Sequence, residues 1–466
     1  METPKPKLEK YQLVAPDGGW GYVVAAALTL MISVTIIPMS SFGLIFGRFL
    51  ASIGDETTGT TLANGIFNTC FNITGLAANN LLQKYTYRTV ALAGALVFFI
   101  GSFATIFVTT LPQMVLSFGV IQGLGMGLMF PAFFTALNSY FDRKLNIVNA
   151  VAQAFMVVAG MSFPFVGQFF MEKFGFRGSV ALISGLSVHC ILAAFTLQPV
   201  EWHLIKQKIT LEQEELLGLD DGKYVMPKPR ASIISLGDRA VSVTTLNKPQ
   251  AKKSNFLQNL AKSMDLAMFK DPVYVNISLG LSLGFTADVA FISIIPLVLI
   301  NAGFNSHETA FFMSIFFAAD LCARIFLTVI SAATKIKNRY YFLTGSALLV
   351  IFRTAFVARN DYYWKLATVA SVGFLRAFIQ TPLPVVISEQ YSENFSTAFS
   401  LYMVVCGVVC FIFGPLMSFV KKVTQSDVMV VHLLSLAYLT CVATWTIELI
   451  IKRLRKKQDR TQGAKK

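Results

Sequence analysis

The 466-residue chain is 55% hydrophobic and 14% charged, whereas soluble proteins carry about a quarter charged residues. A mean hydropathy of +0.61 excludes an ordinary soluble domain and indicates a protein with many membrane spans. The net charge of +14 fits basic loops beside a membrane, and we expect no nucleic-acid partner because no basic face interleaved with aromatic residues is evident.

Apolar segments of roughly bilayer length recur along the whole chain. They predict helices at 19–46, 61–83, 88–110, 112–137, 146–171, 178–198, 273–301, 308–333, 340–358, 364–388, 396–420 and 428–451. The sequence therefore predicts an all-α polytopic membrane protein with twelve transmembrane helices in two six-helix halves. The predicted regions are an N-terminal tail at 1–18, a first bundle at 19–198, a central loop at 199–272, a second bundle at 273–451 and a basic tail at 452–466.

Most of the 39 Lys and Arg residues lie in the two tails, the central loop and the short loops on the same side. The positive-inside rule therefore predicts that both termini and the central loop are cytosolic. The N-terminal stretch is polar and has no leader-like apolar run, so the first helix is expected to direct membrane insertion. We expect the plasma membrane, with an intracellular membrane as the alternative.

Prolines fall in corresponding helices of the two halves, at 38 and 296, at 131 and 382, and at 164 and 415. Broken or kinked helices at matching positions indicate a transporter built from repeats, with its site between them. The alternative is that prolines are simply frequent in membrane helices. We favour the repeats.

Charged residues deep in the membrane are confined to the second half. The four are Asp288, Asp320, Arg324 and Arg376. Arg353 and Glu448 lie nearer the ends of their helices, where we expect them to extend toward the membrane surface. Because a charge at the bilayer centre costs at least about 2.5 kcal/mol, the four deep charges are predicted to be functional.

The stretch AADLCAR, residues 318–324, places Asp320 and Arg324 four residues apart on one helix face. One interpretation is an ion pair that serves only packing. We favour a functional one, in which Arg324 binds a substrate carboxylate and Asp320 acts as the coupling or gating residue.

Asp288 and Arg376 allow two interpretations, between which the sequence does not decide. They could pair across the seventh and tenth helices. Alternatively, Asp288 could hold a substrate ammonium group while an arginine holds the carboxylate, which would suit an amino-acid-like solute.

No other motif indicates chemistry. There is no nucleophile with its base and no phosphate-binding loop or metal-ligand cluster, so we expect no enzyme activity, no cofactor and no metal. Asn64, Asn68, Asn72 and Asn79 share one face of the second helix, where they could line a water path or bond to a neighbouring helix. We favour the bonds between helices.

Several stretches together resemble the monocarboxylate transporter family. They are APDGGWGYVV at 15–24, NSYFDRKLNIVNAVAQAF at 138–155, FGFRGS at 174–179 and SIFFAADLCAR at 314–324. The signature positions are Asp17, Gly18, Gly19, Trp20, Tyr140, Phe141 and Arg143. The resemblance covers the whole chain and implies the major facilitator fold, whose first, fourth, seventh and tenth helices line a central cavity.

In proton-coupled members, an Asp and an Arg of the eighth helix work with a Lys of the first. The pair carries over to Asp320 and Arg324, but the Lys position falls at Ser40 or Met39. Members without this Lys include carriers of aromatic amino acids and other solutes. Arg376 is unusual for the family, and we hypothesise that it supplies the missing positive charge.

The sequence therefore predicts a secondary transporter of a small monocarboxylate or related organic acid, working by alternating access and coupled to protons. Arg324, Arg376 and Asp288 are the predicted substrate-binding residues. The alternatives are a proton-independent carrier of an amino-acid-like or zwitterionic solute, and a membrane receptor or scaffold without transport. Expected partners are the substrate, protons, the lipid bilayer and a single-pass accessory glycoprotein of the kind that some relatives need.

Overall fold

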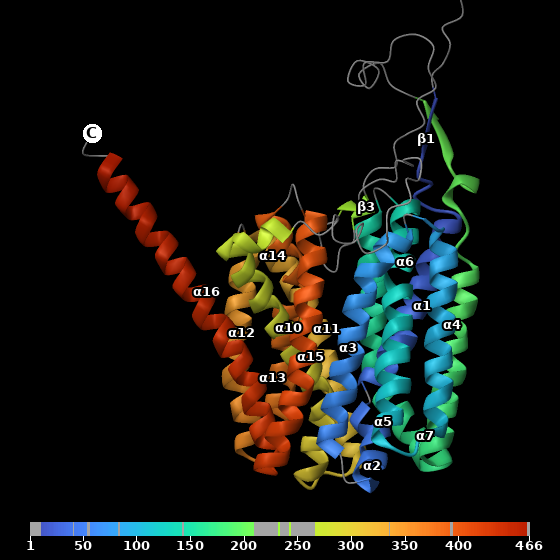
Figure 1. The fold of residues 1–466 in the computed structure, drawn as a ribbon, viewed down its shortest axis with the longest axis vertical. Coiled ribbons are helices and arrows are strands. Elements are labelled where there is room, and N and C mark those ends of the chain that lie inside the picture. The colour runs from blue at the N-terminus through green and yellow to red at the C-terminus, as the bar shows by residue number, and fades with distance from the viewer. Residues whose placement is uncertain are drawn as a thin grey trace, which may run out of the picture.

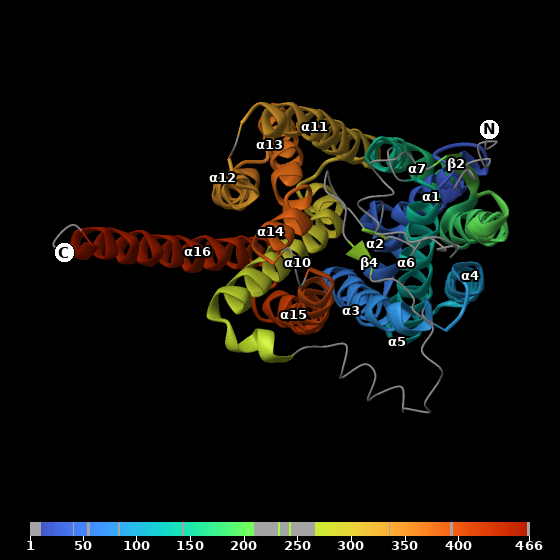
Figure 2. The same cartoon turned by 90° about the horizontal axis from the view of Figure 1, so that it is seen from above.

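The computed structural model shows two helical bundles side by side (Figures 1 and 2). It describes residues 11–40, 42–53, 56–82, 84–141, 144–208, 232–233, 242–243, 266–334, 336–391 and 395–463. All twelve predicted segments fall on helices. Within the described ranges, nine helices are long and apolar enough to cross a membrane. The structure is therefore the expected all-α polytopic one.

The first half is built from helices before residue 200. They are α1 (Trp20–Ser40), α2 (Phe42–Ser52), α3 (Glu56–Leu82), α4 (Tyr87–Ala104), η1 (Thr105–Phe107), α5 (Leu111–Met114), η2 (Val115–Gln122), α6 (Gly123–Tyr140) and α7 (Leu145–Phe195). Helix α7 covers two predicted spans and bends at Gly175, where a φ of +65° lets the chain turn between them.

The second half follows a short helix, η4 (Leu266–Lys270). Its helices are α10 (Pro272–Asn301), α11 (Ser306–Ala333), α12 (Asn338–Ala358), α13 (Tyr362–Gln380), α14 (Leu383–Gln390), α15 (Phe395–Thr424) and α16 (Asp427–Gly463). Helix α16 continues beyond its predicted end at 451, so the predicted basic tail is helical as far as 463.

Short strands lie outside the two bundles. Strand β1 (Tyr11–Val14) pairs antiparallel with β2 (Ile205–Lys208), just after η3 (Val200–Trp202), and β3 (Ser232–Ile233) pairs with β4 (Ser242–Val243). The first pair joins the predicted N-terminal tail to the start of the predicted central loop. Figure 1 shows β1 and the C-terminal end of α16 at the same end of the molecule.

The two halves meet along two helix pairs, α3 with α15 and α7 with α11, on opposite sides of the centre (Figure 2). In the first pair the backbones lie close together. A Cβ added to Gly65 would lie only 3.0 Å from the Cα of Gly414. In the second pair, Ser314 Oγ donates a 2.6 Å hydrogen bond to the carbonyl of Met161. Small residues at these crossings allow the close approach that membrane helices use.

Candidate substrate site

Five charged residues of the second half form one cluster where α10, α11, α12 and α13 converge: Asp288, Asp320, Arg324, Arg353 and Arg376. On α11, Asp320 Oδ2 accepts a 3.1 Å bond from Arg324 Nε, as the four-residue spacing predicts. The same oxygen accepts a 2.8 Å bond from Arg376 Nη1 of α13. Asp320 is therefore shared by two arginines from different helices.

Asp288 of α10 pairs with Arg376, so the first of the two open interpretations describes this structure. Asp288 Oδ2 accepts hydrogen bonds from Arg376 Nε at 2.9 Å and from Gln380 Nε2 at 2.7 Å. Arg376 and Gln380 lie one helical turn apart on α13 and reach the carboxylate together. Arg376 consequently bridges both aspartates.

Arg353 of α12 is the member of the cluster that sequence reasoning missed. It was expected to extend toward the outer surface, but its side chain is fully buried. Its guanidinium lies over the rings of Phe291 and Tyr438, with its central carbon 4.1 and 4.8 Å from the ring centres. Nη1 donates to the carbonyl of Ala287 at 3.0 Å, and Nη2 lies 3.7 Å from Asp288 Oδ1.

The cluster therefore contains three arginines and two aspartates, one positive charge in excess when all are ionised. Both carboxylates are at most 2% exposed, and the Arg376 side chain is 9% exposed. Arg324, with 20% of its side chain exposed, is the most accessible of the three arginines. A desolvated site with excess positive charge is suited to binding an anion.

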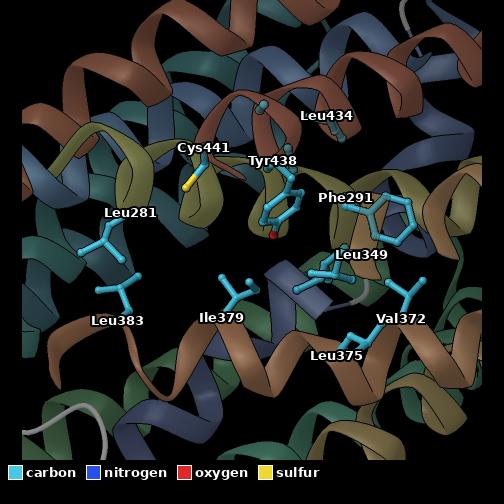
Figure 3. Packing of buried hydrophobic residues seen from close by; sticks show 14 of the residues in the cluster. Leu281, Phe291, Leu349, Val372, Leu375, Ile379, Leu383, Leu434, Tyr438 and Cys441 are labelled. Atoms are coloured by element: carbon cyan, nitrogen blue, oxygen red, sulfur yellow. The ribbon is translucent and has the colours of Figure 1, made fainter. Parts of the chain in front are cut away.

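An apolar core fixes the helices that carry these charges (Figure 3). Leu434 and Tyr438 of α16 face Leu375 and Ile379 of α13, and Phe291 of α10 lies beside them. Tyr438 also donates a hydrogen bond to the carbonyl of Gly284 at 3.0 Å. The fully buried Arg353 lies against Tyr438, so the cluster is enclosed by packed side chains on the α16 side.

A glycine sets the spacing between α11 and α13. Gly373 lies one turn before Arg376, and a Cβ added there would collide with the backbone carbonyl of Phe316, one turn before Asp320. The absence of a side chain thus brings the two helices close enough for the Arg376–Asp320 bond.

Replacing Gly373 by Ala is expected to force α13 away from α11, lower stability by about 1–3 kcal/mol and weaken uptake. The matched control is Gly185→Ala in α7, because a Cβ there meets nothing within 4 Å. Thermal unfolding of both variants in detergent tests this. Equal melting temperatures would show that the helix spacing tolerates the methyl group.

The asparagine face of α3 differs from expectation. Asn64, Asn68 and Asn72 each donate a hydrogen bond to the carbonyl four residues earlier in their own helix. Within the described part of the chain these bonds stay inside α3 rather than joining it to another helix, and the side chain of Asn79 lies outside the described residues. Asn64 and Asn68 line a cavity of about 10 Å³ between α3, α10 and α15, which is room for at most one water molecule.

Comparison with known proteins shows which superfamily the chain belongs to and which proteins it resembles. Residues 20–415 match the model of the Major Facilitator Superfamily. The chain belongs to this superfamily. It is 24% identical to monocarboxylate transporter 1 of Rattus norvegicus over 72% of its own length and 64% of the relative's. For monocarboxylate transporter 7 of Homo sapiens the identity is 24%, over 83% and 78%.

Monocarboxylate transporter 3 of Gallus gallus is also 24% identical, over 72% of this chain and 60% of the relative. The chain thus spans less than two thirds of the length of the rat and chicken relatives. These relatives are named monocarboxylate transporters, and at about 24% identity the chain is divergent from them.

Signature residues from the two motifs, Asp17, Trp20 and Tyr140, lie together at the end of the first helical bundle that also carries β1 and β2. Asp17 donates its backbone N–H to the carbonyl of Tyr140 at 3.1 Å, which joins the two signature motifs directly. Trp20 Nε1 donates to the carbonyl of Thr196 at 3.0 Å, and the ring of Trp20 stacks on His203. These contacts of the signature residues form a structural clasp. The clasp is distant in sequence from the charged cluster.

The clasp contains a turn at residues 17–19, and this turn includes both of its glycines. Asp17 and Gly19 have positive φ angles of 48° and 55°, and the ring of Phe141 lies against Gly21, where a Cβ would be 3.0 Å away. Gly18 precedes Gly19 in the turn, and its nearest side chain is that of Tyr22. Arg143, the remaining signature position, lies outside the described residues.

A further ion pair and a hydrogen bond to a carboxylate lie in the second half outside the cluster. Glu448 accepts bonds from both terminal nitrogens of Arg339, at 3.0 and 2.7 Å, so it is paired rather than extended into solvent alone. Tyr391, outside the spans, donates to Asp271 Oδ2 at 2.5 Å. Burial, with this hydrogen bond to the carboxylate, raises the pKa of the Tyr391 phenol.

Proposed function

We propose that this chain is a secondary transporter that moves a small monocarboxylate or related organic acid across the membrane by alternating access. The observation that carries the proposal is the buried five-residue cluster with one positive charge in excess. It lies on α10, α11, α12 and α13, in a member of a transporter superfamily. An organic monoanion would neutralise that excess.

Arg324 is the proposed first contact of the substrate carboxylate, and Arg376 the second. Arg324 is the most exposed arginine of the cluster, and its planar guanidinium can bind a carboxylate through two parallel hydrogen bonds. Arg376 contributes the positive charge that a Lys of the first helix gives to proton-coupled relatives. With Arg353 also counted, the three arginines and two aspartates carry the same excess of one positive charge as the Lys–Asp–Arg set that the resemblance implies.

Asp320 is the proposed coupling or gating residue. Its Oδ2 holds two arginines, while its buried Oδ1 has no hydrogen-bond partner among the described residues. A proton on Oδ1 would neutralise the carboxylate and weaken its hold on Arg324. The released guanidinium could then bind the substrate, which would link substrate binding to protonation.

Asp288 is the proposed positioning partner of the substrate site. In this structure it accepts bonds from Arg376 and Gln380, so a substrate ammonium group would have to displace them. This occupancy favours a simple carboxylate over a zwitterion. The α3–α15 and α7–α11 pairs are the surfaces along which the halves would rock.

The proposed setting is the plasma membrane, with both termini cytosolic. The strand β1 and the end of α16 lie at one end of the molecule, and basic residues such as Lys452 and Arg453 continue α16 there. A single-pass accessory glycoprotein for surface delivery remains part of the proposal.

Uptake into liposomes containing the purified protein tests the function. The labelled panel is lactate, pyruvate, aromatic amino acids, creatine and carnitine, each with and without an inward proton gradient. We expect uptake of a monocarboxylate that the gradient stimulates, and loss of that stimulation in Asp320→Asn, because the amide takes no proton.

Other outcomes would redirect the proposal. Uptake of an amino acid or zwitterion that ignores the gradient would identify a facilitative carrier. Binding of a panel member without any flux, in vesicles where a control transporter works, would identify a receptor or scaffold.

A further inference from the structure

Arg353 is placed to serve as a second partner for Asp288. Its Nη2 lies 3.7 Å from Asp288 Oδ1, which is within ion-pair range but beyond the roughly 3.2 Å limit of a good hydrogen bond. Meanwhile, Asp288 Oδ2 is held by Arg376 at 2.9 Å. The two carboxylate oxygens of Asp288 thus face two different arginines, one closely and one at a distance.

The hydrogen bonds of Arg353 are incomplete although the side chain is fully buried. Nη1 donates to the carbonyl of Ala287, but Nε and Nη2 have no hydrogen-bond partner among the described residues. A buried charged donor without a partner is costly, so such a group calls for an explanation. The Phe291 and Tyr438 rings on which it rests offset part of that cost.

We propose that Asp288 exchanges arginine partners: when Arg376 leaves it, Arg353 closes the remaining gap and takes its place. Arg353 is then a positioning residue that lowers the cost of freeing Arg376. The use of this exchange in transport rests on the proposed function, in which the substrate carboxylate draws Arg376 away. The exchange itself is a property of the cluster and needs no substrate.

Arg353 affects the binding of an anion because it keeps the buried charge of Asp288 paired. Without Arg353, withdrawing Arg376 would leave Asp288 as a buried carboxylate whose one remaining partner among the described residues is Gln380, so Arg376 would stay in place. With Arg353 present, the carboxylate keeps a cationic partner throughout. Arg376 is thereby free to serve either Asp320 or a bound anion.

Melting temperatures of purified variants in detergent, without substrate, test the exchange. Arg353→Gln is measured in the wild type and in the Arg376→Gln background. In the Arg376→Gln background, we expect Arg353→Gln to lower the melting temperature by about 2 °C or more beyond its effect in the wild type. The reason is that Arg353 is then the only arginine among the described residues that faces Asp288. In Asp288→Asn backgrounds the difference should vanish.

The matched control is Arg339→Gln, a buried arginine of the same helix that rests on Trp445 and pairs with Glu448 outside the cluster. Its effect should be equal in both backgrounds. If Arg353→Gln does not fold, Arg353→Met, which is also uncharged, replaces it in the same comparison. Equal effects of the Arg353 variant in both backgrounds would overturn the exchange, whether or not the uptake experiment succeeds.

Discussion

Arg376→Gln is expected to abolish uptake and to destabilise the protein more than other single changes in the cluster. Arg376 bonds to Asp288 and to Asp320, so its loss strips cationic contacts from two buried carboxylates at once. Removing one partner of a buried ion pair costs about 3–5 kcal/mol. Initial uptake rates in liposomes and thermal unfolding in detergent measure the two effects.

A second change should separate charge imbalance from simple loss of packing. In the Arg376→Gln background Arg353 is the partner that Asp288 takes, so Asp288→Asn should lower the melting temperature further and recover none of the uptake, whereas a loss of packing alone would leave the melting temperature unchanged. Lys365→Gln is the control, because Lys365 is a buried cation of the same helix that bonds to the carbonyl of Phe356, away from the cluster. Normal uptake by Arg376→Gln would remove Arg376 from the proposed site.

Arg324→Ala is expected to impair uptake strongly while leaving the fold intact. Asp320 keeps its bond to Arg376 in this variant, and Arg324 is partly exposed, so little stability should be lost. Losing one or two charge-assisted hydrogen bonds to a substrate carboxylate should raise KM by about 10- to 100-fold. Initial uptake rates over a range of substrate concentrations measure this.

Arg324→Lys should recover part of the affinity, because it keeps the charge but not the planar pair of donors. Arg453→Ala, which removes an exposed arginine at the end of α16, should leave KM unchanged. An unchanged KM in Arg324→Ala, with normal protein levels, would assign carboxylate binding to another residue.

Local spacing predicted one part of the site well. The four-residue interval between Asp320 and Arg324 sets a common helix face, and the structure contains that pair. The apolar segments of bilayer length likewise predicted every helix that carries the cluster. The bridge from Arg376 to Asp320 was not predicted, because it depends on how closely α13 approaches α11 at Gly373.

Arg353 shows why sequence position is a poor guide to depth. It lies near the C-terminal end of α12, which suggested an outward side chain. Side chains on a helix tilt toward its N-terminus, however, so Arg353 is directed back toward the middle of its helix. The acceptors and aromatic rings that it meets there come from α10 and α16, which no local pattern reveals.

The β1–β2 pair was missed for a different reason. Its strands are only four residues each, lie on either side of the whole first bundle and carry no long apolar run. Their pairing depends on the clasp between Asp17 and Tyr140, which holds the start of α1 against the end of α6. Such long-range pairing follows from the fold rather than from strand propensity.

The central claim, that the buried cluster recognises a carboxylate through Arg324, is tested most directly by ligand-induced thermal stabilisation. The purified protein and Arg324→Ala are each heated with the carboxylic acid that is taken up best and with its uncharged methyl ester. Stabilisation by the acid alone, lost in the variant, is the predicted result, because a ligand stabilises a protein only by binding its folded state. Equal stabilisation by acid and ester, or an undiminished effect in Arg324→Ala, would contradict the claim.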